Sequence, residues 1–259
     1  MPSILTLFYH EVLYRPLFNA LAVLTNIIPG HDIGLAIVVL TLAVRIILFP
    51  FSHRALVTQH ALKALEPEIE KIKKEHQNNA AEQGKRTMEL YKAHGVNPFS
   101  GCVTLLVQLP LLIALYHVFW RGISLQGVDL YPFIATPEVV KTLFLGMVDL
   151  TKPSWVFAVL AGASQFLQIK LATPSLPPGG ANIREEMTRA MAIQSLYVFP
   201  VLIFILSIQF PAALPLYWTV TNLFATVHEG FLRSRAKMIQ NLSHEGGRSK
   251  NQGNHQSPS

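Results

Sequence analysis

The chain alternates long apolar segments with polar ones, and five of the apolar segments are close to the length needed to cross a bilayer. An α-helix rises about 1.5 Å per residue, so about 20 residues span the roughly 30 Å hydrocarbon core. The segment 33–51 is almost wholly apolar apart from Arg45. The pattern predicts five membrane-spanning helices at residues 33–51, 99–120, 154–172, 190–210 and 214–232.

The segments between the predicted spans differ in composition. Residues 1–32 include an apolar stretch in which Arg15 and Asn19 share one helical face, which is typical of an amphipathic helix lying in the membrane interface. Residues 52–98 carry eight Lys or Arg and six Glu, with apolar residues at helical spacing, and predict a helical hairpin in water. The remaining segments are a loop at 121–153, a linker at 173–189, a tight turn at 211–213 and a basic tail at 233–259. Part of the loop, 139–148, is apolar enough to touch the membrane interface. The composition of the tail predicts disorder.

Composition and charge agree with a membrane protein. Of the 259 residues, 51% are hydrophobic and 14% are charged, whereas a soluble domain has about 25% charged residues. The net charge of +6 comes from basic residues between apolar segments, not from a nucleic-acid-binding motif. If the spans number five, the hairpin, the linker and the tail lie on one side of the membrane. They hold sixteen Lys or Arg when Lys170, at the end of the third span, is counted with the linker, against four on the other side. Because Lys and Arg stay cytoplasmic, we expect the N-terminus outside and the C-terminus in the cytoplasm.

The motifs of common enzymes are absent from the sequence. The single cysteine, Cys102, excludes disulfides and Cys-based metal sites within the chain. The ten histidines form no HExxH pattern, and there is no P-loop, GxGxxG or recognisable hydrolase motif. We therefore expect no enzyme and no cofactor, with a protease of dispersed residues as an alternative. A small-solute transporter is a second alternative, although the five segments show no internal repeat of the kind common in transporters.

Arg45 is the one charged residue in the first predicted span. A guanidinium near the bilayer centre costs about 2.5–3.5 kcal/mol, so it either reaches the headgroups or faces protein or a wet cavity. The first four predicted spans contain no Asp or Glu. This favours a cavity open to the cytoplasm, or an acidic group brought by a substrate. A structural scaffold with a headgroup-reaching arginine stays an alternative.

Four segments, read in order, resemble the YidC/Oxa/Alb family of membrane protein insertases in its compact five-span bacterial YidC form. They are DIGLAIVVLTLAVRIILFPF at 32–51, GVNPFSGCVTLLVQLPLLIALYHVF at 95–119, GASQFLQIKL at 162–171 and FPAALPLYWTVTNLF at 210–224. Together they include parts of all five predicted spans in the order of the family.

The resemblance implies an all-α polytopic fold with five helices around a hydrophilic groove that opens to the cytoplasm and laterally to lipid. Arg45 matches the groove arginine of the family, Gln168 matches a polar residue of the third span with Gln165 as a second candidate, and Trp218 matches an aromatic position of the fifth span. The implied function is an insertase and chaperone that receives nascent membrane proteins and releases their helices into the bilayer of the bacterial plasma membrane. The Sec translocon and the ribosome are further candidate partners, and no cofactor is implied.

Overall fold

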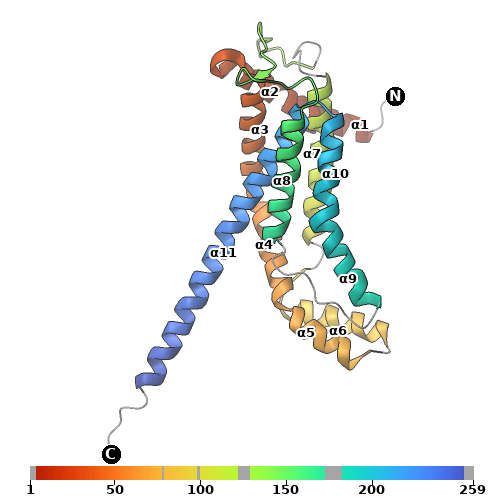
Figure 1. Cartoon of the computed structure of the whole chain (residues 1–259), viewed down its shortest axis with the longest axis vertical. Helices are drawn as coiled ribbons and strands as arrows, with labels where there is room; N and C mark the ends of the chain where they lie inside the picture. Colours follow the sequence, from red (N-terminus) through yellow and green to blue (C-terminus); the bar gives the residue numbers. More distant parts are fainter. Residues whose placement is uncertain (1–3, 78, 98–99, 122–128, 173–182, 254–259) are drawn as a thin grey trace, which may run out of the picture. The chain divides into compact units, whose positions relative to one another are not determined.

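The structure is a computed structural model that describes residues 4–77, 79–97, 100–121, 129–172 and 183–253. It is almost entirely helical (Figure 1), so the predicted all-α class is confirmed. The chain divides into two compact units, Met1–Val148 and Asp149–Ser259, which are described in turn.

The first unit begins with helical segments that follow one another without a break. α1 (Ile4–Phe8) continues through a π-helical segment, η1 (Tyr9–Tyr14), into α2 (Arg15–Ile27). Pro16 lies in the first turn of α2, where a missing N–H removes no intrahelical hydrogen bond. α2 therefore corresponds to the helix that the sequence predicts within residues 1–32.

The polar face of α2 contacts protein. Asn19 is only 2% exposed, and its Nδ2 donates to the backbone oxygen of Asp129 at 2.8 Å while its Oδ1 accepts from the N–H of Tyr131 at 2.7 Å. The Arg15 guanidinium lies 4.7 Å from the centre of the Tyr131 ring. His10 Nε2 lies 3.0 Å from Asp129 Oδ1. The hydrophilic stripe of α2 thus serves to hold the loop at 129–131.

Asp32 fixes the start of the helix that carries Arg45. A 3-10 turn, η2 (Pro29–His31), leads into Asp32, and α3 (Ile33–Ile47) follows. One carboxylate oxygen of Asp32 accepts from the backbone N–H groups of Gly34 and Leu35, at 2.8 and 3.2 Å. A carboxylate at this position satisfies N–H groups that have no partner within the helix, so the sequence places the start of α3 sharply.

The segment after Asp129 returns to the same end of α3. Its strands β1 (Leu143–Phe144) and β2 (Val148–Asp149) pair with each other, and they are the only two strands among the described residues. Lys141 donates its N–H to the His31 oxygen at 2.9 Å, and Ile33 donates to the Lys141 oxygen at 3.1 Å. These hydrogen bonds attach the loop to the N-terminus of α3.

The helix that begins at Ile33 bends before its predicted end at Phe51. α3 ends at Ile47, and α4 (Phe49–Ala64) continues at an angle of 63°. Pro50 lies in the first turn of α4 and has no N–H to donate to the preceding turn. The proline therefore accounts for the break at Leu48.

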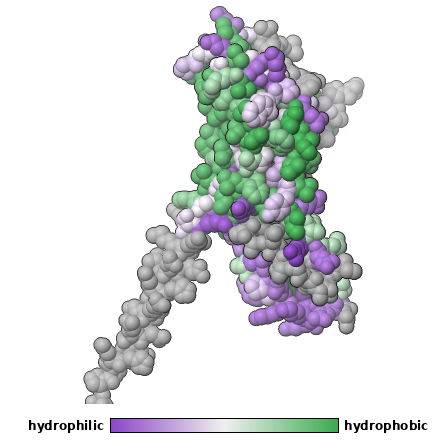
Figure 2. Space-filling view, in the orientation of Figure 1, coloured by the Kyte–Doolittle hydropathy of each residue, from purple (hydrophilic) through white to green (hydrophobic). Residues whose placement is uncertain are grey.

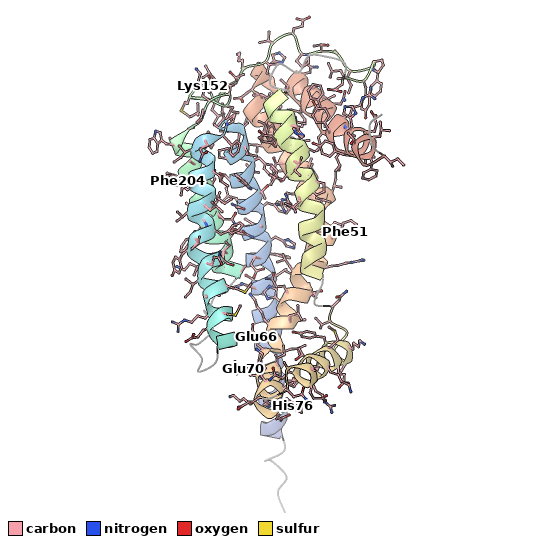
Figure 3. All side chains as sticks on the ribbon, turned by 90° about the vertical axis from the view of Figure 1, so that its right-hand side faces the viewer. Phe51, Glu66, Glu70, His76, Lys152 and Phe204 are labelled. Atoms are coloured by element: carbon pink, nitrogen blue, oxygen red, sulfur yellow. The ribbon has the colours of Figure 1, made fainter. Side chains whose placement is uncertain are left out.

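The polar segment 52–98 includes the end of α4 and two further helices. α5 (Glu66–Glu75) packs against α6 (Ala80–Ala93), and Gln83 Nε2 on α6 donates to the backbone oxygen of His76 at 2.8 Å. Charged side chains such as Glu70 project from this pair (Figure 3), and its surface is hydrophilic (Figure 2). α7 (Ser100–Arg121) is the last helix of the first unit.

In the second unit, α8 packs against both α10 and α11. Its helical segments are α8 (Trp155–Ala172), α9 (Ile183–Ile193), η3 (Gln194–Val198), α10 (Phe199–Gln209) and α11 (Ala213–Gly253). α11 extends into the tail 233–259, for which the sequence pattern predicts disorder. The helix continues because most residues between 233 and 240 have a high helix propensity, namely Arg, Ala, Lys, Met and Gln. Residues 254–259 lie outside the described residues.

Membrane-spanning candidates can be assigned among the described residues by length and apolar composition. α8 and the stretch Arg189–Gln209 each qualify, and α3 with α4 qualifies as a bent pair. The apolar stretch Gln108–Phe119 within α7 is shorter. Two or three spans are thus supported, and the count of five stays a prediction. The predicted linker at 173–189 lies largely outside the described residues.

Replacing Gly162 with Leu should loosen the packing of α8 on α10. A Cβ at Gly162 would lie 3.2 Å from Phe204 Cβ and 3.2 Å from the backbone oxygen of Pro200, and overpacking of this kind costs about 1–3 kcal/mol. The midpoint of thermal denaturation should therefore fall. Gly230→Leu is the control, because a Cβ there would meet no described atom within 4 Å. Equal denaturation midpoints for the two variants would contradict this packing.

Candidate functional site

Two of the predicted site residues lie together on α8. Gln165 Nε2 donates to Gln168 Oε1 at 3.2 Å, and both side chains are half-buried. Residues three apart on a helix are neighbours, so the spacing alone places the two amides on adjoining positions. Each amide keeps further donor and acceptor capacity after this one bond.

A buried hydrogen bond joins α8 to α11 beside this pair. Asn222 Nδ2 on α11 donates to Ser164 Oγ on α8 at 3.2 Å, and Ser164 donates to the Ala161 oxygen at 3.0 Å. Asn222 is 4% exposed and Ser164 is 6% exposed. Polar side chains in apolar helices commonly hydrogen-bond across helices in this way.

α8 and α11 run in the same direction from a shared starting point. Ala212 donates its N–H to the Lys152 oxygen at 2.9 Å, and Ala213 donates to the Leu150 oxygen at 3.2 Å. These bonds place the turn before α11 against the residues that precede α8. Positions that are the same number of residues from the starts of α8 and α11 therefore lie at similar depth. The hydrogen bond between Ser164 and Asn222 agrees with this.

Along the helix axes, Trp218 and Gln168 lie on opposite sides of the hydrogen bond between Ser164 and Asn222. Trp218 is half-buried and precedes Asn222 by one turn of α11, whereas Gln168 follows Ser164 by one turn of α8. The predicted aromatic and polar residues are thus on neighbouring helices of one unit, about two turns apart.

Further buried hydroxyl groups occur in the same unit. Ser207 on α10 and Thr221 and Thr226 on α11 have buried hydroxyl oxygens with no hydrogen-bond partner among the described residues. An unsatisfied buried hydroxyl costs about 1–3 kcal/mol, so these three positions lower the stability of the helix packing. We call Ser164, Gln165, Gln168, Asn222 and Thr226 the polar strip. The sequence reasoning missed Ser207 and Thr226, for which the signal is a hydroxyl inside an otherwise apolar helical stretch.

Arg45 belongs to the first unit and lies in the last turn of α3. Its side chain is half-buried, and the C-terminal end of a helix favours a positive charge. Because the helix bends at Leu48, Arg45 lies three residues before the end of a straight segment and not in the middle of a longer straight helix. Arg45 also has an interaction partner in the structure, so an acidic ligand would exchange with an existing contact.

Glu229 on α11 is a buried carboxylate, 4% exposed. Arg233, one turn later, places its Nε 2.8 Å from Glu229 Oε1. A carboxylate buried without a partner would be costly, and this arginine compensates its charge. Among the described residues, no three His, Cys, Asp or Glu side chains form a group that could hold a metal ion.

The apolar helices with a sparse set of polar side chains define a helical membrane protein, and comparison with known proteins gives its family. The family model described as "60Kd inner membrane protein" matches residues 23–240. The chain belongs to this family. With the apolar helices, the match supports a multi-pass protein of the bacterial inner membrane.

Similar proteins cover most of this chain. The membrane protein insertase YidC of Fusobacterium nucleatum is 33% identical over 225 residues, which is 86% of this chain and 98% of that protein. MisCA of Bacillus subtilis, also named a membrane protein insertase, is 31% identical over 84% of this chain and 76% of its own length. YidC of Magnetococcus marinus is 30% identical over 88% of this chain, which spans only 36% of that protein.

Replacing Asn222 with Ala should weaken the contact between α8 and α11. Hydrogen bonds between helices in membranes contribute about 0.6 kcal/mol on average, with a maximum of about 1.7. A double-mutant cycle with Ser164→Ala, read from unfolding free energies in lipid bicelles, should give a coupling of that size. Leu223→Ala, at an exposed position of the same helix, should show no coupling with Ser164→Ala. Zero coupling for the Asn222 and Ser164 pair would contradict the assigned bond.

Proposed function

We propose that this chain is a membrane protein insertase that receives hydrophobic client proteins and releases their helices into the lipid bilayer. The observation that carries the proposal is the 33% identity to the Fusobacterium insertase over 98% of that protein. The family match over residues 23–240 supports it as well. Insertion makes and breaks no covalent bond, so the proposal needs no catalytic residue.

The polar strip supports a route for hydrophilic client segments. A peptide group without a partner costs several kcal/mol in hydrocarbon, which is the barrier that a polar segment meets when it enters the bilayer. The half-buried side-chain amides of Gln165 and Gln168 can donate and accept hydrogen bonds at membrane depth. We assign Gln165 and Gln168 to client binding, with Trp218 as an apolar contact for the client helix.

Arg45 is proposed to attract acidic groups of the client. A guanidinium forms charge-assisted hydrogen bonds with carboxylates, each worth about 1.5–3 kcal/mol, and its interaction strengthens where the local dielectric is low. Binding transfers Arg45 from its present contact to the client carboxylate. An acidic segment in a short client tail is thereby drawn to membrane depth.

Release follows from the properties of the client helix. An apolar helix gains about 25 cal/mol for each Å² removed from water, so it is more stable in lipid than in a hydrated site. With the N-terminus outside and the basic hairpin and tail in the cytoplasm, as we propose from the charge distribution, the membrane potential also acts on the acidic client tail. A Sec-type translocon and the ribosome stay candidate partners of this cycle.

A small-solute transporter is one of the alternative functions that the sequence leaves open. The relatives compared above are named insertases, so they give that alternative no support.

Arg45→Ala should reduce insertion of a client whose short outer tail is acidic by about tenfold, the effect of losing roughly 1.4 kcal/mol of interaction. The measurement is protease protection of the client in proteoliposomes. Arg45→Lys should retain much of the activity if charge decides, and less if the planar guanidinium is needed. Arg54→Ala, at an exposed position of α4, is the matched control and should insert as the unmodified protein does.

Two outcomes of this experiment separate the claims. Unchanged insertion by Arg45→Ala at equal protein level would contradict the role of Arg45 and leave the insertase function standing. Equal client insertion into liposomes that lack the protein would instead refute the insertase function for that client.

A cysteine at Gln168, in a chain whose Cys102 is replaced by Ser, should react with a membrane-impermeant maleimide added from the cytoplasmic side. The same reagent should not label a cysteine at Val201, an exposed apolar position of α10. The measurement is a gel shift on inverted membrane vesicles. Equal inertness at both positions would contradict a hydrated route at Gln168.

A further inference from the structure

The β1–β2 hairpin of the first unit presents apolar side chains to its surroundings. Leu143, Leu145 and Met147 are 50%, 55% and 76% exposed. Exposed apolar side chains grouped within a few residues mark a binding surface more often than singly scattered ones. The hairpin has no role in the insertion steps described above.

The tip of the hairpin holds a leucine in a conformation that favours glycine. Met147 donates its N–H to the Phe144 oxygen at 3.0 Å, and the two residues between them, Leu145 and Gly146, have φ values of 52° and 73°. Positive φ at both central residues is the pattern of a type I′ turn, which Asn or Asp followed by Gly adopts at lower cost. An exposed leucine thus occupies a strained position that a polar residue would fit better.

Asp32 holds this tip at the start of α3. Its second carboxylate oxygen accepts from the N–H of Leu145 at 2.7 Å, while the first oxygen accepts from Gly34 and Leu35 in the first turn of α3. One buried carboxylate thereby joins the tip to the N-terminus of α3, whose next residues are apolar. The tip lies at the level where α3 passes from its polar flank into its apolar segment.

We propose that the tip of the β1–β2 hairpin is a membrane-interface anchor whose partner is the phospholipid surface at the Asp32 end of α3. The apolar tip enters the boundary between headgroups and acyl chains, as apolar side chains of interfacial elements do. Lys141, exposed two residues before β1, is positioned to meet lipid phosphates. Asp32 is the positioning residue, because it couples the depth of the tip to the start of α3. This inference does not rest on the insertase function.

The test is a depth measurement on the full chain in liposomes of phosphatidylethanolamine and phosphatidylglycerol. A nitroxide label is attached at Met147→Cys in a Cys102→Ser background, and its collisions with lipid-soluble oxygen and a water-soluble nickel complex are compared. Glu138→Cys, at an exposed polar position of the same loop, is the matched control. The ratio of oxygen to nickel collisions should be several-fold higher at 147 than at 138.

Each other result overturns a stated part of the proposal. Equal ratios at the two positions would place the tip in water, and low collision with both reagents at 147 would mean that protein, not lipid, covers it. Asp32→Ala should lower the ratio of oxygen to nickel collisions of the label at 147. Circular dichroism should show an unchanged helix content in this variant. An unchanged ratio in that variant would remove the positioning role of Asp32. If Asp32→Ala loses helix content, Asp32→Asn takes its place, because the Asn oxygen can still accept from Gly34 and Leu35 while its NH2 group cannot accept from Leu145. It should lower the ratio at 147 in the same way.

Discussion

Polar groups inside an apolar helix depend on partners within the protein, because hydrocarbon supplies no hydrogen bonds. The second unit meets this constraint at the Ser164–Asn222 bond, which fixes α8 to α11 at one depth. The neighbouring amides of Gln165 and Gln168 satisfy each other only in part. A helix pair held in this way can keep unused hydrogen-bond donors and acceptors at membrane depth without unfolding. A polar segment that enters the bilayer needs such donors and acceptors as partners.

In the first unit, two buried polar side chains bind backbone groups of the segment 129–145. Asn19 binds the backbone at Asp129 and Tyr131, and Asp32 joins the first turn of α3 to the β1–β2 hairpin. Both side chains are buried and both bind backbone groups that would otherwise be unsatisfied. The start of the helix that carries Arg45 is therefore set by side-chain bonds as well as by its apolar sequence.

The hydrophobic pattern predicts the helical class, which the structure confirms, and the ends of two helices lie close to the ends of predicted segments. α8 begins one residue after the predicted start of the span 154–172 and ends with it, and α3 begins at Ile33 as expected. Such ends follow from a change between polar and apolar residues, or from a capping residue such as Asp32, which are local signals.

Other features depended on contacts that no local pattern reveals. Pro50 is visible in the sequence, but whether it kinks a span or ends one depends on packing, and the helix bends by 63° before it. The burial of Asn19 required the loop at 129–131, about 110 residues away in the chain. Ser207 and Thr226 were missed because single hydroxyls in apolar helices usually bond to their own backbone. The pairing of Gln165 with Gln168 was predictable from spacing. The absence of Asp and Glu from the first four predicted spans already favoured a wet cavity or an acidic substrate at Arg45, whereas the role of Trp218 came from the family resemblance alone.

The central claim is that the polar strip receives the client during insertion, and site-specific photo-crosslinking tests it most directly. A photoreactive amino acid is placed at Gln168, or at the adjacent exposed residue Leu167, and a ribosome-bound client is stalled midway through insertion. The account predicts a strong crosslink to the polar segment of the client from position 168 and a weak one from 167. Equal crosslinking from both positions, or none from 168 while the client inserts normally, would contradict it.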